Sequence, residues 1–168
     1  EKMGMLGQIV AGVAHEINTP TGAILNLCAD AHEHLRQLVF LESIIQDVPE
    51  TTQRWLREVL ARVLNDQTVR SEASMRMQRR KIESQLVAAG IAGSRRIAEI
   101  AVACELADEV LLPEVVHHLS HETVLSVLEH AMALKMFAEI SARSARKIAR
   151  IVRALKSYSR ADHGELAD

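Results

Sequence analysis

The sequence predicts an all-α fold, and three features of its composition lead to that prediction. Aromatic residues make up only 2% of the chain, whereas β-sheets favour aromatic and β-branched side chains. Gly and Pro occur only seven and three times, which argues against the many turns of a sandwich or barrel. Hydrophobic residues still reach 48%, so we expect helices that pack on aliphatic side chains.

The first expected element is one long helix over residues 1–46. At about 100° per residue, the apolar side chains of this segment fall on one stripe that continues for about eleven turns. The residues of the stripe are Leu6, Ile9, Val10, Val13, Ile17, Ile24, Leu27, Cys28, Ala31, Leu35, Leu38 and Ile45. Pro49 ends this pattern and opens the next helix.

Residues 47–119 are expected to form an all-helical insert of shorter elements. In order, these are a helix over 50–64, a loop over 65–73, and helices over 75–89, 94–105 and 113–119. Trp55 is the expected core anchor of the insert. Gly90 is placed to end one helix as a C-cap, while Ser94 caps the next helix and Pro113 begins the last.

A second long helix is expected over residues 120–160, with Ser120 as its N-cap and Glu122 in its first turn. One face carries Leu134, Phe137, Ser144, Ala145, Ile148, Val152 and Leu155. Residues 161–168 are small and polar, so we expect a frayed exit there.

Each long helix presents one apolar stripe, and a single hairpin of two helices cannot bury both stripes fully. Two hairpins side by side can do so, as an antiparallel four-helix bundle. The predicted architecture is therefore a long helical hairpin that forms a dimeric antiparallel four-helix bundle, with an all-helical insert between the two hairpin helices.

Charge and cysteine content limit the expected surroundings of the chain. The net charge is −2 and the pI is about 6.5, so we expect no nucleic-acid partner. Cys28 and Cys104 are expected to be small core residues in a reducing, cytoplasmic compartment.

No run of about 18–20 apolar residues occurs, so we expect no direct membrane contact. Because the chain begins at Glu1 rather than Met, we expect a piece of a larger protein, and any membrane anchor of that parent would lie outside it.

The stretch Val13–Pro20, VAHEINTP, carries the chemistry that distinguishes this sequence. His15 lies about 200° from Val13 on the helical wheel and should therefore face solvent. A neutral imidazole is a good nucleophile near pH 7. If Glu16 accepts a hydrogen bond from Nδ1–H, then Nε2 is free to attack. The alternative is an ordinary solvated His–Glu pair.

Two residues beyond this pair suggest further roles. Thr19 follows His15 by four residues, so its hydroxyl lies on the same face and could hold a water molecule in line with a phosphoryl group. Pro20 lacks an N–H group, so the carbonyl of Glu16 loses its helical partner and the helix is expected to bend. The alternatives are a Thr that is merely tolerated and a kink without a role.

The segment KMGMLGQIVAGVAHEINTPTGAILN resembles the H-box of sensor histidine kinases, the helix that carries their phospho-acceptor histidine. The later segment ARSARKIARIVRALKSYSR resembles the second helix of the same dimerisation and phosphotransfer domain. The resemblance covers somewhat under half of the chain, and its specific part is the order Gly-Gln, Ala-His-Glu and Asn-Thr-Pro. Two departures stand out: an insert of about 75 residues replaces the usual short turn, and no ATP-lid or Walker-type motif occurs.

The resemblance implies that His15 is the phosphorylated residue and that Glu16 is its acid–base partner. It also implies that Thr19 helps to hydrolyse the phosphoryl group of the partner and that Pro20 is the bend.

The chain would be a homodimer and part of a protein-histidine kinase. ATP and Mg²⁺ would be bound by a separate catalytic domain, and the receiver domain of a response regulator would take the phosphoryl group on an aspartate. The fragment alone should be inactive and should bind no cofactor itself. Two other functions remain open, namely a monomeric histidine phosphotransfer relay and a non-enzymatic helical dimerisation module.

The remaining clusters are expected to be structural. Glu114, His117, His118 and His121 form an E-x-x-H-H-x-x-H pattern with partial metal-ligand spacing, but no second Glu-x-x-His follows, so we expect surface histidines and no metal. The basic run over 70–81 is expected to be a solvated face, with docking of an acidic partner as the alternative. His32 and His34 cannot share one helix face, and we expect neither to be a ligand.

Overall fold

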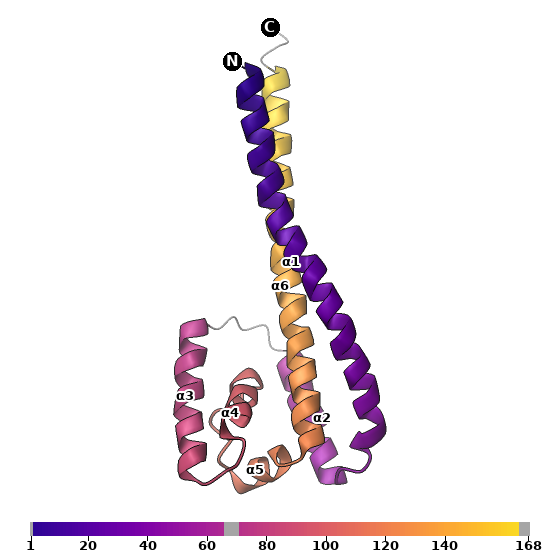
Figure 1. Ribbon diagram of the computed structural model, residues 1–168, viewed down its shortest axis with the longest axis vertical. Helices are drawn as coiled ribbons and strands as arrows, with labels where there is room; N and C mark the ends of the chain where they lie inside the picture. The colour runs from indigo at the N-terminus through magenta and orange to yellow at the C-terminus, as the bar shows by residue number, and fades with distance from the viewer. Residues whose placement is uncertain (1, 66–70, 165–168) are drawn as a thin grey trace. The chain divides into compact units, whose positions relative to one another are not determined.

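The computed structural model describes residues 2–65 and 71–164, with side chains over 12–65 and 71–157, and every element in this part of the chain is an α-helix (Figure 1). The helices are α1 (Lys2–Ile45), α2 (Glu50–Asn65), α3 (Glu72–Ala88), α4 (Ser94–Ala103), α5 (Pro113–Leu119) and α6 (Glu122–Gly164). The all-α class is confirmed. No helix in the described ranges has an apolar stretch long enough to cross a bilayer.

The chain divides into two compact units, and the boundary between them lies inside both long helices. The first unit contains the residues up to His32 and those from Met136 onward, so it holds the start of α1 and the end of α6. The second unit is Glu33–Lys135, and the expected insert 47–119 lies within it. His15 therefore belongs to the first unit.

In the first unit, the covered residues of α1 alternate at spacings of four and three. The spacing holds for Val13, Ile17, Pro20, Ile24, Leu27 and Ala31, with Pro20 buried and the others half-buried, while Thr21, Gly22 and Ala23 next to Pro20 are half-buried as well. In α6 a similar pattern is followed by the half-buried residues Phe137, Ile140, Ser144, Ile148, Ile151 and Leu155, with Ser141 half-buried beside them. Such spacing is typical of long helices that pack along a narrow seam. The two helices run in opposite directions here (Figure 1).

Three members of the expected apolar faces prove to be exposed in this unit. Cys28 is an exposed free cysteine rather than a core residue, and Val152 is 48% exposed. Ala145 is exposed as well. The wheel predicts a stripe wider than the seam that one neighbouring helix covers, and these residues lie at its edge. The side chains of Leu6, Ile9 and Val10 lie outside the described part.

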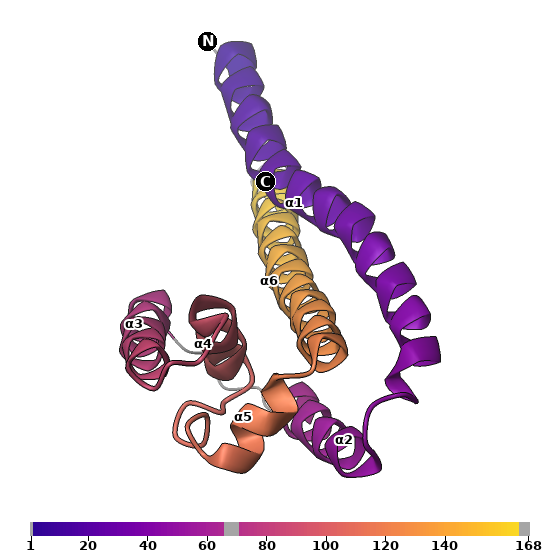
Figure 2. The same ribbon diagram turned by 60° about the horizontal axis from the view of Figure 1, so that its bottom comes forward.

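The second unit has the main hydrophobic core, to which α2 to α6 all contribute. Its most deeply buried aliphatic side chains are Val63, Ile82, Leu86, Leu106, Val110, Leu119, Val124 and Leu128. Each such side chain contributes about 1.5–3 kcal/mol when it is removed from water. Trp55 packs against this core and is partly buried, and Cys104 is fully buried, as expected. Helices α3 and α4 pack against each other at the edge of this unit (Figure 2).

The short loop between α3 and α4 contains one confirmed helix end and one correction. Gly90 has φ 71°, and the hydrogen bond from Ile91 N to Leu86 O closes the end of α3, as expected of a glycine in this place. Ser94 is not the N-cap of α4. Gly93 takes that position with φ 71°, while the Ser94 hydroxyl donates to the carbonyl of Ile91.

Other helix ends also differ from expectation. Helix α4 ends at Ala103 instead of Glu105, because Glu105 has φ 60° and cannot continue a right-handed helix. Ser120 caps the end of α5 rather than the start of α6, since its hydroxyl donates to the carbonyl of His117 at 2.7 Å. Helix α3 begins earlier than expected, at Glu72, because the side chain of Ser71 accepts the N–H of Ser74. Helix α6 continues to Gly164, past the expected end near 160, and 165–168 lie outside the described residues.

A charged network joins α4 to α6 in the second unit. Arg96 donates to both carboxylate oxygens of Glu129, at 2.6 and 2.8 Å, and to Glu122 at 2.7 Å. The two carboxylates raise the pKa of Arg96 still further above its already high value. A planar guanidinium held by two carboxylates fixes direction as well as distance, so the network sets the register of α4 against α6.

Candidate functional site

His15 lies on an exposed face of α1 in the first unit, while Val13 and Ile17 on either side of it are half-buried. The three positions follow from helix geometry, because residues two apart lie about 200° apart around the axis. A protein that approaches the first unit can therefore reach the imidazole. The exposure agrees with the helical wheel, but the expected role of His15 in phosphoryl transfer remains a prediction.

Glu16 is also exposed, and in the described part of the chain no hydrogen bond joins it to His15. Adjacent residues of a helix point about 100° apart, so the carboxylate must turn back to reach Nδ1. The two groups lie next to each other without an existing bond. The acid–base role of Glu16 remains a prediction.

Pro20 is buried within α1, and the two threonines that flank it bond to the backbone one turn earlier. Thr19 donates from Oγ1 to the carbonyl of His15 at 3.0 Å, and Thr21 donates from Oγ1 to that of Ile17 at 2.8 Å. Proline removes the N–H that would bond to Glu16, and threonines bonded in this way favour a bend. The helix remains continuous through this segment. The backbone carbonyl of Glu16, next to His15, thus has no N–H partner from residue 20.

The four residues of the expected surface cluster in the insert have mixed surroundings. Glu114 and His117 are exposed, whereas His118 and His121 are half-buried. No group of three or more His, Cys, Asp or Glu side chains suited to a metal ion occurs in the described residues. Nε2 of His121 is buried and has no hydrogen-bond partner within that part of the chain. The expectation of surface histidines is therefore wrong for His118 and His121.

His118 has a structural task that the sequence does not reveal. Its ring stacks on Trp55, with 4.8 Å between the ring centroids, and its Nδ1 is hydrogen-bonded to Oγ1 of the buried Thr52 at 2.9 Å. Burial, together with the nearby His117 and His121, lowers the pKa of His118. A neutral His118 ring therefore belongs to the packing between α2 and α5.

A second histidine contact joins residues that lie 96 positions apart. Nδ1 of His34 in α1 is 2.6 Å from Nδ1 of His130 in α6, and both side chains belong to the second unit. His32 is exposed and lies in the first unit. Sequence reasoning finds no signal for this pair, because the two imidazoles lie 96 positions apart in different helices.

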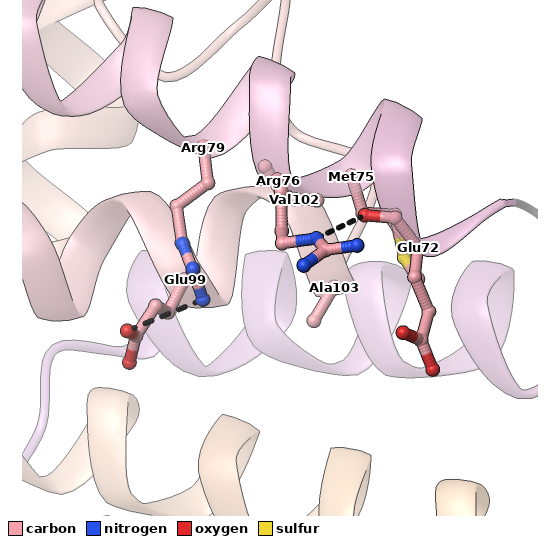
Figure 3. A pocket seen from close by; sticks show the side chains of 7 residues that line it. All are labelled: Glu72, Met75, Arg76, Arg79, Glu99, Val102 and Ala103. Atoms are coloured by element: carbon pink, nitrogen blue, oxygen red, sulfur yellow. Dashed lines mark hydrogen bonds and ion pairs between the residues drawn. The ribbon is translucent and has the colours of Figure 1, made fainter.

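The basic run of α3 lines an open groove against α4 (Figure 3). The groove has a volume of about 330 Å³ and is lined by Glu72, Met75, Arg76, Arg79, Glu99, Val102 and Ala103. Arg79 and Glu99 face each other across it at 3.6 Å, and Arg76 donates to the carbonyl of Glu72 at 3.4 Å. Arg76, Arg80 and Lys81 are exposed, as expected of a solvated face, while Arg79 is half-buried. Arg70 lies outside the described residues.

The described side chains thus place the exposed His15 next to the exposed Glu16, as they also place His32 next to Glu33, and they form two histidine contacts inside the second unit. No family model, curated protein or solved structure matches this chain.

Proposed function

We propose that this chain is the dimerisation and phospho-acceptor domain of a sensor histidine kinase, with His15 as the phosphorylated residue. The supporting observation is that His15 is exposed opposite a covered seam of α1, five residues before the buried Pro20. This is the arrangement that a large partner needs in order to reach the imidazole. The resemblance of VAHEINTP to an H-box supplies the identity of the reaction.

The proposed reaction requires one nucleophile and one proton acceptor. Nε2 of His15 attacks the γ-phosphorus of ATP, a nitrogen–phosphorus bond forms, and the bond to the bridging oxygen of ADP breaks. Glu16 accepts the hydrogen bond from Nδ1–H and stabilises the positive charge on the ring. ATP and Mg²⁺ are held by a separate catalytic domain of the same protein. The phosphoryl group then passes to an aspartate in the receiver domain of a response regulator.

Thr19 suits the proposed phosphatase role because of the direction of its hydroxyl. Its proton is donated to the carbonyl of His15, so the oxygen presents lone pairs outward. An oxygen of this kind accepts a hydrogen bond from a water molecule and directs the lone pair of that water towards phosphorus. Pro20 and its flanking threonines supply a bend through which the direction of the His15 face can change.

The proposed homodimer is supported by apolar side chains that stay uncovered in the first unit. Leu25 is 66% exposed, Met136 is 49% exposed and Val152 is 48% exposed. Exposed apolar side chains that gather into one patch mark surfaces that another protein covers, and these three residues are the described candidates for such a patch. A second copy of the hairpin would complete the antiparallel four-helix bundle, and the same proposal places the domain in the cytoplasm, where ATP and response regulators are found.

Phosphoryl transfer to the chain tests the proposal directly. The chain is incubated with radiolabelled ATP and the catalytic domain of its parent, and acid-labile label is measured in wild type, His15→Gln and His32→Gln. We expect label in wild type and in His32→Gln, whose exposed histidine lies on the same helix, and at least about a hundredfold less in His15→Gln. Full labelling of His15→Gln would overturn the proposal.

The oligomeric state distinguishes the proposed domain from a monomeric relay. Light scattering at micromolar concentration should give the mass of a dimer, because the exposed apolar residues need a second copy. A monomer that still accepts label on His15 from another phosphoprotein would instead support the relay. A chain that is never labelled, and whose parent signals normally with His15→Gln, would support a non-enzymatic module.

A further inference from the structure

His34 and His130 form a close contact between α1 and α6 inside the second unit. The Nδ1 atoms are 2.6 Å apart, the ring centroids are 4.9 Å apart and the ring planes are inclined by 58°. Both side chains are half-buried. Two nitrogens at this distance must share a hydrogen, because two bare lone pairs or two N–H groups would repel each other.

The number of protons on the pair determines whether the contact can exist. When both rings are neutral, one Nδ1 carries hydrogen and donates to the lone pair of the other. One added proton can enter at Nε2 of the donor, and the hydrogen bond then becomes charge-assisted. A second added proton must enter at the accepting Nδ1. Two N–H groups would then face each other, and the bond cannot survive.

The distance fits a proton and not a metal ion. Imidazole nitrogens lie about 2.0–2.1 Å from Zn²⁺, which keeps two tetrahedral ligands about 3.3 Å apart. At 2.6 Å the two Nδ1 atoms are too close for a shared metal. The described residues also hold no third ligand of the kind that would complete such a site.

The charged groups around the pair are engaged with partners of their own. Glu33, next to His34 on α1, pairs with Arg36 at 3.7 Å and accepts a hydrogen bond from Gln37 at 2.7 Å. Glu129, next to His130 on α6, is held by Arg96 of α4. Burial and the neighbouring His34 lower the pKa of His130, and Glu129 and Glu33 only partly oppose them.

We propose that His34 and His130 form a pH-sensitive clasp that holds α1 to α6 at neutral pH and opens when both imidazoles become protonated. The direction of this pH dependence follows from the number of protons that the closed and open forms bind. Because the pKa of His130 is lower when the clasp is closed, the closed form binds fewer protons than the open form. The clasp is therefore stable above the ordinary histidine pKa of about 6.5, keeps its hydrogen bond while only one ring is protonated, and loses stability at the lower pH at which the second ring takes up its proton. For each proton taken up on opening, the opening equilibrium constant rises by up to about tenfold for every unit by which the pH falls.

Nitrogen-15 NMR of the histidine side chains tests the shared proton in the wild-type chain. We expect a scalar coupling between the two Nδ1 nuclei at pH 7.5, which disappears at low pH as the accepting ring titrates. His34→Gln should raise the pKa of His130 towards its ordinary value, whereas His32→Gln should leave it unchanged. A wild-type chain without this coupling, or a pKa of His130 that does not change in His34→Gln, would overturn the proposal.

Hydrogen exchange over residues 35–45 tests the opening itself. After correction for intrinsic rates, the wild-type and His32→Gln chains should show opening constants at least tenfold larger at pH 5.0 than at pH 7.5. In His34→Gln and His130→Gln this difference should fall to less than about twofold, because no second imidazole is left to protonate. A difference that remains in both variants would contradict the clasp. Neither experiment depends on the phosphorylation of His15.

Discussion

The buried thiol of Cys104 should be almost inert in the folded chain, and the size of the effect can be worked out from its surroundings. Cys104 is 0% exposed, at the end of α4. Burial raises its pKa to about 12, and the positive charge of Arg62 opposes the shift only in part. Because only the thiolate attacks a disulfide reagent, both access and ionisation protect this residue.

The expected magnitude follows from the thiolate fractions. At pH 8, a thiol with a pKa of about 12 is ionised in about one molecule in ten thousand. A thiol in an unfolded chain, with a pKa of about 8.5, is ionised in roughly a quarter of molecules. For the thiol in its buried place, low ionisation therefore slows the reaction about two thousandfold, whereas reaction through an opened state, in which the thiol has its ordinary pKa, is slowed by how rarely that state forms.

Reaction with Ellman's reagent measures this effect in the variant Cys28→Ser, in which Cys104 is the one thiol left. The rate at pH 8 in buffer should be at least about a thousandfold lower than the rate of the same chain in guanidinium chloride. Circular dichroism of the same sample controls for folding. If a fully helical sample reacts within about tenfold of the unfolded rate, then Cys104 does not have the buried environment described above.

Two further predictions concern stability, and both can be measured by urea denaturation with the fluorescence of Trp55, the single tryptophan of the chain, which reports on the second unit. Leu128→Ala should lower the free energy of unfolding by about 3 kcal/mol, because Leu128 is 0% exposed. The matched Leu64→Ala should lower it by less than about 1 kcal/mol, because Leu64 is 57% exposed. Equal losses in the two variants would contradict the core assignment. Gly90→Ala should lower the free energy of unfolding by about 1 kcal/mol. The cause would be the φ of 71° alone, since an added Cβ meets no heavy atom within 4 Å. An unchanged urea midpoint would show that the backbone relaxes at this turn.

Much of the helical order was predictable, because it depends on local chemistry. Helix α1 has a sustained apolar stripe that continues past Pro20, Gly90 ends α3 because a left-handed residue suits a helix end, and Pro113 begins α5 because its fixed φ suits a first turn. The exposure of His15 follows in the same way from its angle to Val13. In each case the residues that decide the outcome lie within a few positions of one another.

Other features could not be predicted, because residues far away in the chain decide them. The partial burial of His118 is one example, because its ring stacks on Trp55 and is hydrogen-bonded to Thr52, 66 positions earlier. Cys28 lies on the expected stripe but is exposed, since a neighbouring helix covers only part of an apolar face.

The sequence by itself therefore determined an all-helical chain with two long amphipathic helices and an outward-facing histidine, because helix periodicity is a property of neighbouring residues. Only the tertiary structure decided which apolar residues are covered and which polar groups meet. The contacts of His34 with His130 and of Thr52 with His118 join residues 96 and 66 positions apart. The physical reason is that such contacts depend on how helices pack, and no local pattern in the sequence records that packing.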